Sequence, residues 1–397
     1  MCPCMLWRNY WGRKRRERQL NTWNMAIGVK RLFCLLTAFW LLAACSRGGD
    51  FPESSPMILP MPSASLVPSP TQESTKTPAP IPTPTELPIT RLLFTGVIVP
   101  ARCVQAAIDE REDPNYLYDE PRELIQSADL SIGTLNATIS DFPPRTGCKQ
   151  TYVLVGGSEN ADALALAGFD VMSVATNHIK NCGILTCGDL AFFDTLENLR
   201  RVGILPVGAG DNLSQALEPV VVEVNGIRFG FVSLGQIEPM AFADEDTPGI
   251  AVLTPENLAA SIAAARVVSD VVIAMPHWGP EDVPNPNYLQ LGLAPVAVEA
   301  GADVVVGNHT HVVQAYETIQ GVPVFYGLGN FVFDQTWARD HQQGVILVLT
   351  FVGTEFASFE LIPTVVDGDG TVHFAEPEEA EEILMRIEAA NDRLPER

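Results

Sequence analysis

Two histidines, His309 and His311, follow an apolar run at Asp303–Val306 with a single residue between them. Such a pair just past a strand can present both imidazole rings to one cavity, and histidine pairs of this kind are common ligands for Zn, Mn or Fe. A third histidine, His277, follows another apolar run, Asp270–Pro276. A histidine at the end of a buried strand is well placed to face a cleft, so these three residues form a predicted metal-ligating group.

Asn177 and His178 follow a third apolar run, Phe169–Ala175. Asn177 offers a neutral carbonyl oxygen, and the adjacent His178 could act as an acid, a base or a ligand. Alone, this dipeptide would be read as a helix cap. Together with the other histidines it predicts a mixed oxygen and nitrogen site for a divalent cation, Mn, Zn or Fe. Such an ion polarises phosphoryl oxygen and lowers the pKa of bound water.

Short β-branched runs alternate with helical runs from residue 91 onward, which indicates sheets covered by helices. Asn225-Gly226 lies between two apolar runs and is a strong hairpin signal, so antiparallel edges should make the sheets mixed. We predict one α/β domain over residues 91–375 and a C-terminal helix and tail over residues 376–397. The predicted strands are Arg91–Thr95, Leu130–Leu135, Phe169–Ala175, Ile204–Val207, Pro219–Val224, Ile227–Leu234, Asp270–Pro276, Asp303–Gly307, Val322–Phe325 and Gly344–Phe351. The predicted helices are Pro121–Ala128, Glu159–Ala167, Gly188–Val202, Leu289–Ala300 and Glu376–Ala390.

Residues 1–45 have the pattern of an N-terminal extension followed by an export signal. Two basic residues precede the apolar run Leu32–Ala44, which is too short to span a bilayer comfortably and fits a signal peptide. The run ends in Leu-Ala-Ala-Cys, which resembles a bacterial lipobox, so Cys45 is the predicted lipidation site. An ordinary cleaved signal and an uncleaved anchor remain alternatives. The sequence leaves open whether translation starts at Met1 or Met25.

Residues 46–90 contain eleven prolines among many serines and threonines, a composition that predicts a disordered, extended tether. We therefore expect an extracytoplasmic lipoprotein, anchored to the membrane and lifted away from it. Beyond residue 45 the chain has 47 acidic and 17 basic residues, a net charge of −30. Such a body repels nucleic acid, so no nucleic-acid partner is expected. The acidity could also serve solubility alone.

Four cysteines remain in the predicted exported body: Cys103, Cys148, Cys182 and Cys187. Thiols outside the cytoplasm suggest disulfides, and four cysteines allow three pairings. Cys182–Cys187 closes the shortest loop, and Cys103–Cys148 would then follow by elimination. Metal binding by these cysteines is disfavoured because they contain no Cys-x-x-Cys pair.

The order of the polar groups resembles that of the poly-γ-glutamate capsule synthesis protein CapA family. The chain reads Asn177-His178, then His277-Trp278-Gly279, then Gly-Asn-His-Thr-His ending at His311. The stretch Phe325–Asp334, with its Leu-Gly-Asn-Phe core, supports the resemblance, which covers roughly residues 91–335. The resemblance implies a calcineurin-like metallophosphatase fold with mixed β-sheet layers flanked by helices.

The resemblance also implies roles for single residues. His178 would protonate a leaving oxygen or steady the transition state. Arg102 and Asn330 would contact an anionic substrate. One metal would be held by three of the implied ligands and a second metal by His311. The implied ligands are Asn177, His277, His309 and His311.

Three positions that are usually acidic in this family carry uncharged residues here. Val97 stands where the first strand usually ends in Asp, Asn136 where the second usually ends in Glu, and Asn181 where an Asp often follows the Asn-His pair. A two-metal site would lose much of its compensating charge through these changes. The sequence therefore predicts either a site for a single metal or a site that has decayed.

Two functions remain open, and the sequence does not decide whether the protein is an enzyme. The first is a component of capsule or poly-γ-glutamate synthesis or export, with weak or no hydrolase activity, which binds an anionic envelope polymer within a capsule-synthesis membrane complex. The second is a single-metal phosphoesterase or amide hydrolase that acts on a polymer or small-molecule substrate at the envelope. A structural surface protein without a ligand is a weaker third alternative.

Overall fold

The computed structural model of the protein describes residues 87–142, 145–181 and 189–396. The described residues belong to one compact unit, and residues 1–86 lie outside them. The predicted lipidation site at Cys45, the tether up to residue 86, and Cys182 and Cys187 also lie outside them, so these predictions stay predictions. Within the described ranges, no helix has both the length and the apolar character needed to cross a bilayer.

The first sheet is built around β1, which pairs in parallel with β2 and β15 and antiparallel with β16. Beyond β2 the sheet stays parallel, and beyond β16 it is antiparallel, so it is mixed. Its strands in the described residues are β1 (Ile89–Ile98), β2 (Leu130–Leu135), β5 (Val171–Ser173), β6 (Leu205–Val207), β15 (Asn330–Val332), β16 (Gln343–Val352), β17 (Glu355–Val366) and β18 (Val372–Phe374).

The second sheet has the order β13-β14-β12-β11-β9-β8, with a parallel centre and an antiparallel strand at each edge. The predicted hairpin joins β8 to β9, and its two turn residues Asn225 and Gly226 have φ angles of 54° and 77°, as a tight hairpin turn requires. The strands are β8 (Val220–Val224), β9 (Ile227–Gly235), β11 (Val271–His277), β12 (Val304–Val306), β13 (Tyr316–Ile319) and β14 (Val322–Phe325).

The two sheets pack face to face through their apolar surfaces. Phe94 of the first sheet and Ile273 of the second lie in the same buried cluster. The rings of Phe229 and Phe351, one from each sheet, meet edge to face with centroids 5.4 Å apart. Continuous apolar strands are expected where both faces of a sheet are covered, and here one face meets the other sheet and the opposite face meets helices.

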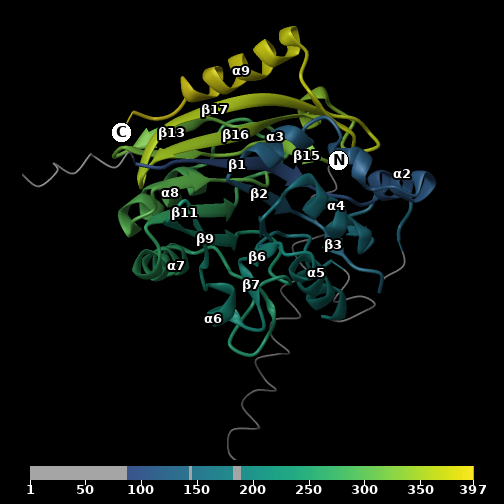
Figure 1. The fold of residues 1–397 in the computed structure, drawn as a ribbon, viewed down its shortest axis with the longest axis horizontal. Helices are drawn as coiled ribbons and strands as arrows, with labels where there is room; N and C mark the ends of the chain where they lie inside the picture. The colour runs from purple at the N-terminus through teal and green to yellow at the C-terminus, as the bar shows by residue number, and fades with distance from the viewer. Residues whose placement is uncertain (1–86, 143–144, 182–188, 397) are drawn as a thin grey trace, which may run out of the picture. The chain divides into compact units, whose positions relative to one another are not determined.

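Helices cover the outer face of each sheet (Figure 1). The first sheet is covered by α2 (Cys103–Arg111), α3 (Arg122–Ser127), α4 (Glu159–Ala167) and α5 (Leu190–Arg201), and the second by α7 (Pro255–Val268) and α8 (Tyr288–Ala300). The last helix, α9 (Pro377–Asn391), lies against β17 and buries Ile383 and Ile387 (Figure 1). The short elements are η2 (Asn115–Tyr118), β3 (Thr138–Ile139), β4 (Val155–Gly156), β7 (Ala209–Gly210), α6 (Leu213–Ala216), β10 (Gly249–Ile250) and η4 (Arg339–Gln342).

The predicted α/β class, with mixed β-sheet layers flanked by helices, is confirmed. Strand Leu130–Leu135 and helix Glu159–Ala167 have the predicted bounds. The sequence interpretation missed α7, although Thr254 caps its N-terminus by accepting a hydrogen bond from the Asn257 N–H. It also missed β17, because much of that strand is exposed and its apolar pattern is weak.

Candidate metal centre and adjoining pocket

Asn177, His277 and His309 come from both sheets and meet at the carboxyl ends of their strands. Asn177 lies in the loop after β5, and His277 is the last residue of β11. The backbone bridges His277 to Asn308, which places His309 beside it. We call Asn177, His277 and His309 the inner cluster, and it contains the three residues predicted to share one metal.

The reactive atoms of the inner cluster converge. The Nε2 atom of His277 lies 3.0 Å from Asn177 Oδ1 and 3.1 Å from His309 Nδ1. The centroids of the two imidazole rings are 4.7 Å apart. All three side chains are buried. About 3 Å is also the separation of neighbouring ligand atoms that each lie about 2.1 Å from one shared cation.

Hydrogen bonds alone account poorly for the short contacts within the inner cluster. A neutral imidazole carries one N–H, so His277 Nε2 can donate to only one of its two neighbours. His277 Nδ1 is buried and has no hydrogen-bond partner among the described residues. A cation could accept the lone pairs of Asn177 Oδ1, His277 Nε2 and His309 Nδ1 together. The donor set therefore fits a divalent metal, although it leaves His277 Nδ1 unpaired.

Burial keeps the histidines of this region neutral. Desolvation, reinforced by the neighbouring rings, lowers the pKa of His277 and of His309 well below the usual range. Desolvation also lowers the pKa of His311 to about 4, against the opposing effect of its hydrogen bond with Asn330. Neutral imidazoles keep a free lone pair at neutral pH, which is the form that binds metals.

The backbone around the histidine pair is strained. His309 and His311 have φ angles of 108° and 60°, and nearby Arg102 and Asp282 have φ angles of 54° and 63°. Non-glycine residues avoid positive φ, and each costs of order 1–3 kcal/mol when it is held there. Strain of this kind gathers at binding and catalytic sites, so its presence on both sides of the pocket supports the assignment of a site.

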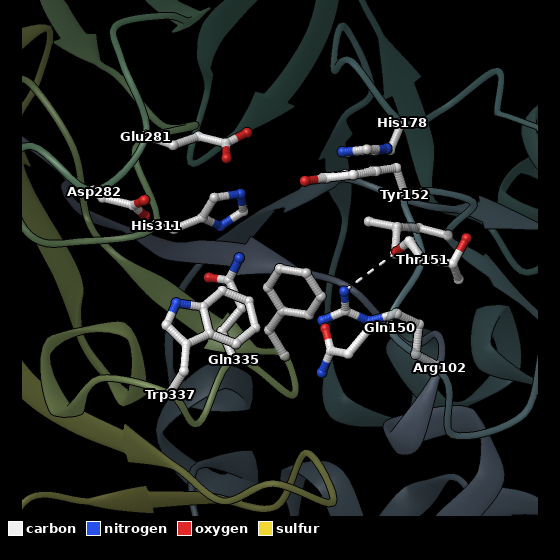
Figure 2. Close-up of a pocket in the computed structure, with 12 residues that line it drawn as sticks. Arg102, Gln150, Thr151, Tyr152, His178, Glu281, Asp282, His311, Gln335 and Trp337 are labelled. Carbon is white, nitrogen blue, oxygen red and sulfur yellow. Dashed lines mark hydrogen bonds between the residues drawn. The ribbon is translucent and has the colours of Figure 1, made fainter. Parts of the chain in front are cut away.

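A pocket of about 510 Å³ adjoins the inner cluster. Figure 2 shows Glu281, Asp282 and His311 on one side of it, His178 and Tyr152 on a second, Arg102 opposite the acids, and Gln335 and Trp337 between Arg102 and His311. The remaining lining residues are Gln150, Thr151, Leu154 and Phe333. Glu281 links the two regions, because its Oε1 lies 3.9 Å from His309 Nε2. Burial raises the pKa of Glu281.

His178 lines the pocket in a fixed orientation. Its Nδ1 lies 2.6 Å from Asn181 Oδ1, and that oxygen also accepts the Leu154 N–H. The oxygen is therefore an acceptor, so His178 Nδ1 carries the proton and Nε2 carries the lone pair in the neutral ring. Burial lowers the pKa of His178. Asn181, which stands where the family often has Asp, thus orients His178 without adding charge.

Asn330 contacts His311. Its Oδ1 lies 2.8 Å from His311 Nδ1, and its Nδ2 donates to Gln335 Oε1 and to the His341 carbonyl. Asn330 is buried and is absent from the pocket lining. Its contacts hold the His311 ring in place, and the predicted substrate contact of Asn330 stays a prediction.

Arg102 reaches the pocket with its charge already compensated. Its guanidinium forms a bidentate ion pair with Asp334, which also accepts the Cys103 N–H. Nη1 donates to the Thr151 carbonyl, and the guanidinium stacks over Phe333. The predicted contact of Arg102 with an anionic substrate would have to be made alongside Asp334.

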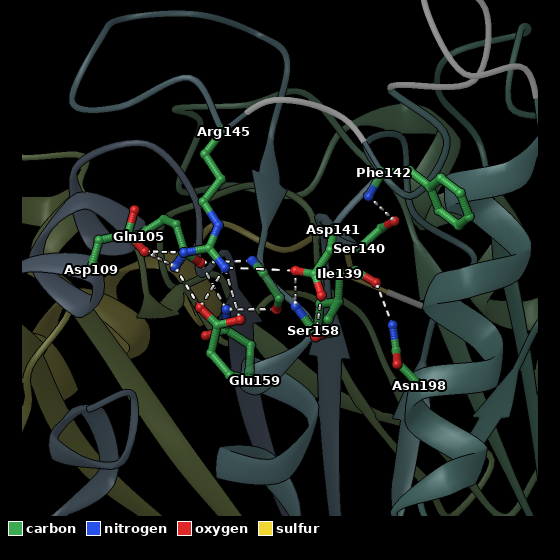
Figure 3. A network of polar contacts seen from close by, with 12 residues as sticks. Gln105, Asp109, Ile139, Ser140, Asp141, Phe142, Arg145, Ser158, Glu159 and Asn198 are labelled. Carbon is green, nitrogen blue, oxygen red and sulfur yellow. Dashed lines mark hydrogen bonds and ion pairs between the residues drawn. The ribbon is translucent and has the colours of Figure 1, made fainter. Parts of the chain in front are cut away.

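The segment that carries Gln150, Thr151 and Tyr152 into the pocket wall is tied down at two further points. Arg145 pairs with Asp109 and Glu159 and lies near Asp141, as Figure 3 shows. The structure joins Cys148 to Cys103 in a disulfide, which is the pairing expected by elimination. We call residues 145–152 the strap.

The carboxyl ends of β1 and β2 in the first sheet differ from those of β11 and β12 in the second, because they are closely packed. A Cβ at Gly96 would lie 2.3 Å from the Gly329 carbonyl oxygen, and that oxygen accepts the Val97 N–H at 2.9 Å. Val97 is fully buried in apolar contacts. Asn136 is also fully buried; its Oδ1 accepts the His178 N–H, and its Nδ2 has no partner among the described residues. We call the carboxyl ends of β1 and β2 the first edge, and those of β11 and β12 the histidine edge.

The structure brings Asn177, His277 and His309 together and sets His311 beside them, with its ring centroid 6.0 Å from that of His309. In the part of the chain that the structure describes, no group of three or more His, Cys, Asp or Glu side chains is arranged to hold a metal. The inner cluster has two histidines and an amide. The sequence interpretation missed the pocket residues Tyr152, Asp282, Gln335 and Trp337. It also missed Asp334 and His341, which contact the pocket residues Arg102 and Asp282. Asp282 had a signal, since it lies three residues after the His-Trp-Gly motif.

Two curated relatives are similar to this chain. It is 30% identical over 256 residues to the PGA biosynthesis protein CapA of Bacillus subtilis, covering 64% of this chain and 66% of that protein. It is 28% identical over 264 residues to the capsule biosynthesis protein CapA of Bacillus anthracis, covering 64% of this chain and 62% of that protein. The matches thus span slightly less than two thirds of each relative.

Two solved structures have a similar arrangement. A phosphatase from Mycoplasma pneumoniae has a TM-score of 0.47 at 12% identity, covering 70% of this chain and 94% of its own. The NAD nucleotidase of Haemophilus influenzae has a TM-score of 0.42 at 13% identity, covering 77% of this chain and 56% of its own.

The family model described as the bacterial capsule synthesis protein PGA_cap matches residues 91–335. That span includes both edges, the inner cluster and most of the pocket lining. It equals the span over which the histidine motifs predict the resemblance. The chain therefore belongs to the bacterial capsule synthesis protein family PGA_cap.

Proposed function

We propose that this protein is an accessory protein of capsule-polymer synthesis or export that binds one divalent cation in the inner cluster and a polymer in the adjoining pocket. The observation that carries the proposal is the convergence of Asn177 Oδ1, His277 Nε2 and His309 Nδ1 beside that pocket. The named roles of the relatives, PGA and capsule biosynthesis, support poly-γ-glutamate as the polymer.

The proposed ion is Mn, Zn or Fe, because two imidazole nitrogens and one amide oxygen suit a borderline divalent cation. When bound, such an ion polarises a phosphoryl or carbonyl oxygen and lowers the pKa of bound water. The chain's own part is to hold its three ligand atoms within about 3 Å of one another and to keep both imidazoles neutral by burial.

Weak or absent hydrolase activity is part of the proposal. The inner cluster contains no carboxylate, and Val97, Asn136 and Asn181 are uncharged where the family usually has acids. Glu281 is the nearest described acid to His309, at 3.9 Å. A site with neutral ligands binds a cation less tightly than one with carboxylates and compensates less charge in a transition state.

A single-metal hydrolase is the second candidate, and the orientation of His178 favours it. With Nδ1 donating to Asn181, the Nε2 lone pair is available to take a proton from water or to return one to a leaving group. The test is a panel of phosphodiester and γ-glutamyl amide substrates with Mn²⁺. Turnover that survives His178→Gln unchanged would eliminate this candidate.

We also propose that the protein is an extracytoplasmic lipoprotein, anchored through Cys45 and separated from the membrane by its Pro-rich tether. The lipobox-like sequence and the eleven prolines of residues 46–90 support this. The test is the intact mass of the membrane-extracted protein, which should begin at a diacylated Cys45. Cys45→Ser should release the protein from the membrane fraction, and unchanged membrane association would contradict the proposal.

Calorimetric titration of chelator-treated protein with Mn²⁺ tests the metal proposal. We expect one ion per chain, and we expect His309→Ala to weaken binding by about a hundredfold or more, since it removes one of three ligand atoms. His373→Ala is the matched control, because His373 lies on β18, away from both edges. Two tightly bound ions per chain, or unchanged affinity in His309→Ala, would refute the proposal.

A further inference from the structure

Hydrogen-bond acceptors gather on one wall of the pocket, and His311 is the best defined of them. The Asn330 amide donates its nitrogen to Gln335 and to the His341 carbonyl, so its oxygen is the atom that faces His311 Nδ1. That oxygen can only accept, so His311 Nδ1 carries the proton in the neutral ring. The Nε2 lone pair is then free. His311 is 2% exposed, lines the pocket, and has no described hydrogen-bond partner at Nε2.

Two carboxylates stand beside His311 on the same wall (Figure 2). Glu281 lies 3.9 Å from the nearest His309 nitrogen, which is too long for a hydrogen bond. Asp282 meets His341 Nε2. Carboxylate oxygens and the His311 Nε2 lone pair all act as hydrogen-bond acceptors. We call His311, Glu281 and Asp282 the acceptor wall.

Gln335, Arg102 and Trp337 line the rest of this part of the pocket and offer donors. Gln335 uses its side-chain oxygen to accept from Asn330, which leaves its amide N–H groups as the remaining polar function. Arg102 contributes guanidinium N–H groups beside its partner Asp334. Trp337, 56% exposed at the rim, adds an indole face and one N–H. Figure 2 shows Arg102 across the pocket from Glu281 and Asp282, with Gln335 and Trp337 between Arg102 and His311.

A pocket polarised in this way fits a ligand with a cationic donor at one end and a carboxylate close by. The interior of a γ-linked glutamate chain carries carboxylates and amides but no ammonium group, and its carboxylates would be repelled by Glu281 and Asp282. The amino-terminal residue of that chain carries a primary ammonium with a carboxylate on the same carbon. Aromatic faces such as Tyr152 and Trp337 at the rim favour an ammonium further.

We infer, resting on the proposed function, that the pocket binds the free amino terminus of the polymer and discriminates it from the polymer interior. The ammonium group lies against the acceptor wall of His311, Glu281 and Asp282. Its neighbouring carboxylate lies toward Gln335 and Arg102. The protein thereby recognises amino-terminal chain ends, each of which is present once per polymer whatever the polymer's length.

The test compares γ-linked tri-glutamate with its N-acetyl form, which lacks only the charged ammonium. Calorimetric titration of the full chain, treated with chelator and kept near neutral pH, should give about tenfold or more weaker binding of the acetylated form, the size of one charged hydrogen bond. Glu281→Gln should reduce or remove the preference for the free-amine form over the acetylated form. The matched control is Glu299→Gln, because Glu299 is exposed on α8 and absent from the pocket lining.

The outcomes separate this inference from the proposed function. Equal binding of both trimers by the wild type overturns the inference and leaves polymer binding intact. If neither trimer binds but L-glutamate binds more tightly than glutarate, the ammonium site stands and the polymer assignment fails. If Mn²⁺ displaces the free-amine trimer and Glu281→Gln abolishes Mn²⁺ binding, the acceptor wall is a metal site and the inference is wrong.

Discussion

The histidine edge and the first edge occupy equivalent places in their sheets. The histidine edge presents candidate metal ligands, whereas the first edge is closely packed. At the histidine edge, His277 and His309 project neutral imidazoles into the inner cluster. At the first edge, Val97 is buried among apolar side chains, and its N–H donates a hydrogen bond to the Gly329 carbonyl. Asn177 is the one contribution of the first sheet to the inner cluster.

This difference shows that the absence of an acid at Val97 goes together with close packing of the backbone around it. Gly96, Gly329 and Gly344 approach so closely that a Cβ at Gly96 would lie 2.3 Å from a carbonyl oxygen, and one at Gly344 would lie 2.1 Å from the Asn330 oxygen. An ion and its water would need space that this packing occupies. The first edge is therefore closed by its neighbours as well as short of charge.

Val97→Asp should have the largest effect of the variants that test this comparison. It buries a carboxylate at a fully buried position in an apolar cluster, so we expect a loss of about 3–5 kcal/mol in the free energy of unfolding. Chemical denaturation of the variant beside Val97→Ala, which removes volume without adding charge, separates the two causes. A variant of near wild-type stability that takes up a second Mn²⁺ would mean that the first edge is open.

Asn177→Ala tests the contribution of the first sheet to the inner cluster. Loss of its Oδ1 should weaken Mn²⁺ binding by about ten- to a hundredfold, because two imidazoles remain to hold the ion. Calorimetric titration gives the affinity, and Asn115→Ala, a change at a half-buried position on η2, is the control. Unchanged affinity would confine the cation to the histidine edge.

Asn136→Asp sharpens the comparison by restoring one acid. One carboxylate oxygen can still accept the His178 N–H, and the other replaces an Nδ2 that lacks a described partner. Added ligand charge should raise Mn²⁺ affinity by roughly tenfold, while the metal-free variant should be less stable than the wild type. The measurement is the melting temperature with and without Mn²⁺. A variant that is destabilised equally in both conditions would show that charge alone does not reopen this edge.

His373→Gln should have the smallest effect on stability, and it serves as a reference for histidines outside both edges. Its ring bridges Glu120 and Asp367, and the hydrogen bond to Glu120 raises its pKa. A raised pKa stabilises the fold below the unfolded value of about 6.5, and this stabilisation disappears as the pH rises through the folded value. His373→Gln should therefore cost no more than about 1 kcal/mol, and only at acidic to neutral pH. An equal cost at alkaline pH would assign the effect to packing.

The convergence of Asn177, His277 and His309 was predictable, because each follows an apolar run and the ends of parallel strands meet at one edge of a sheet. The partner of Arg102 was not, since Asp334 lies 232 residues away along the chain and only tertiary packing joins them. Tyr152 and Trp337 were missed for a similar reason. They lie in irregular segments, whose path depends on the strap and on η4 rather than on any local periodicity.

The strap bears on how this protein should be produced for study. Its disulfide to Cys103 closes a loop across 45 positions, which in a chain-entropy model is worth about 4 kcal/mol. Material made in a reducing cytoplasm would lack that bond while keeping the inner cluster, which uses no cysteine. Such a preparation would still take up metal but would have a loosened pocket wall at Gln150, Thr151 and Tyr152. Selectivity measured on it would describe the preparation rather than the mature protein.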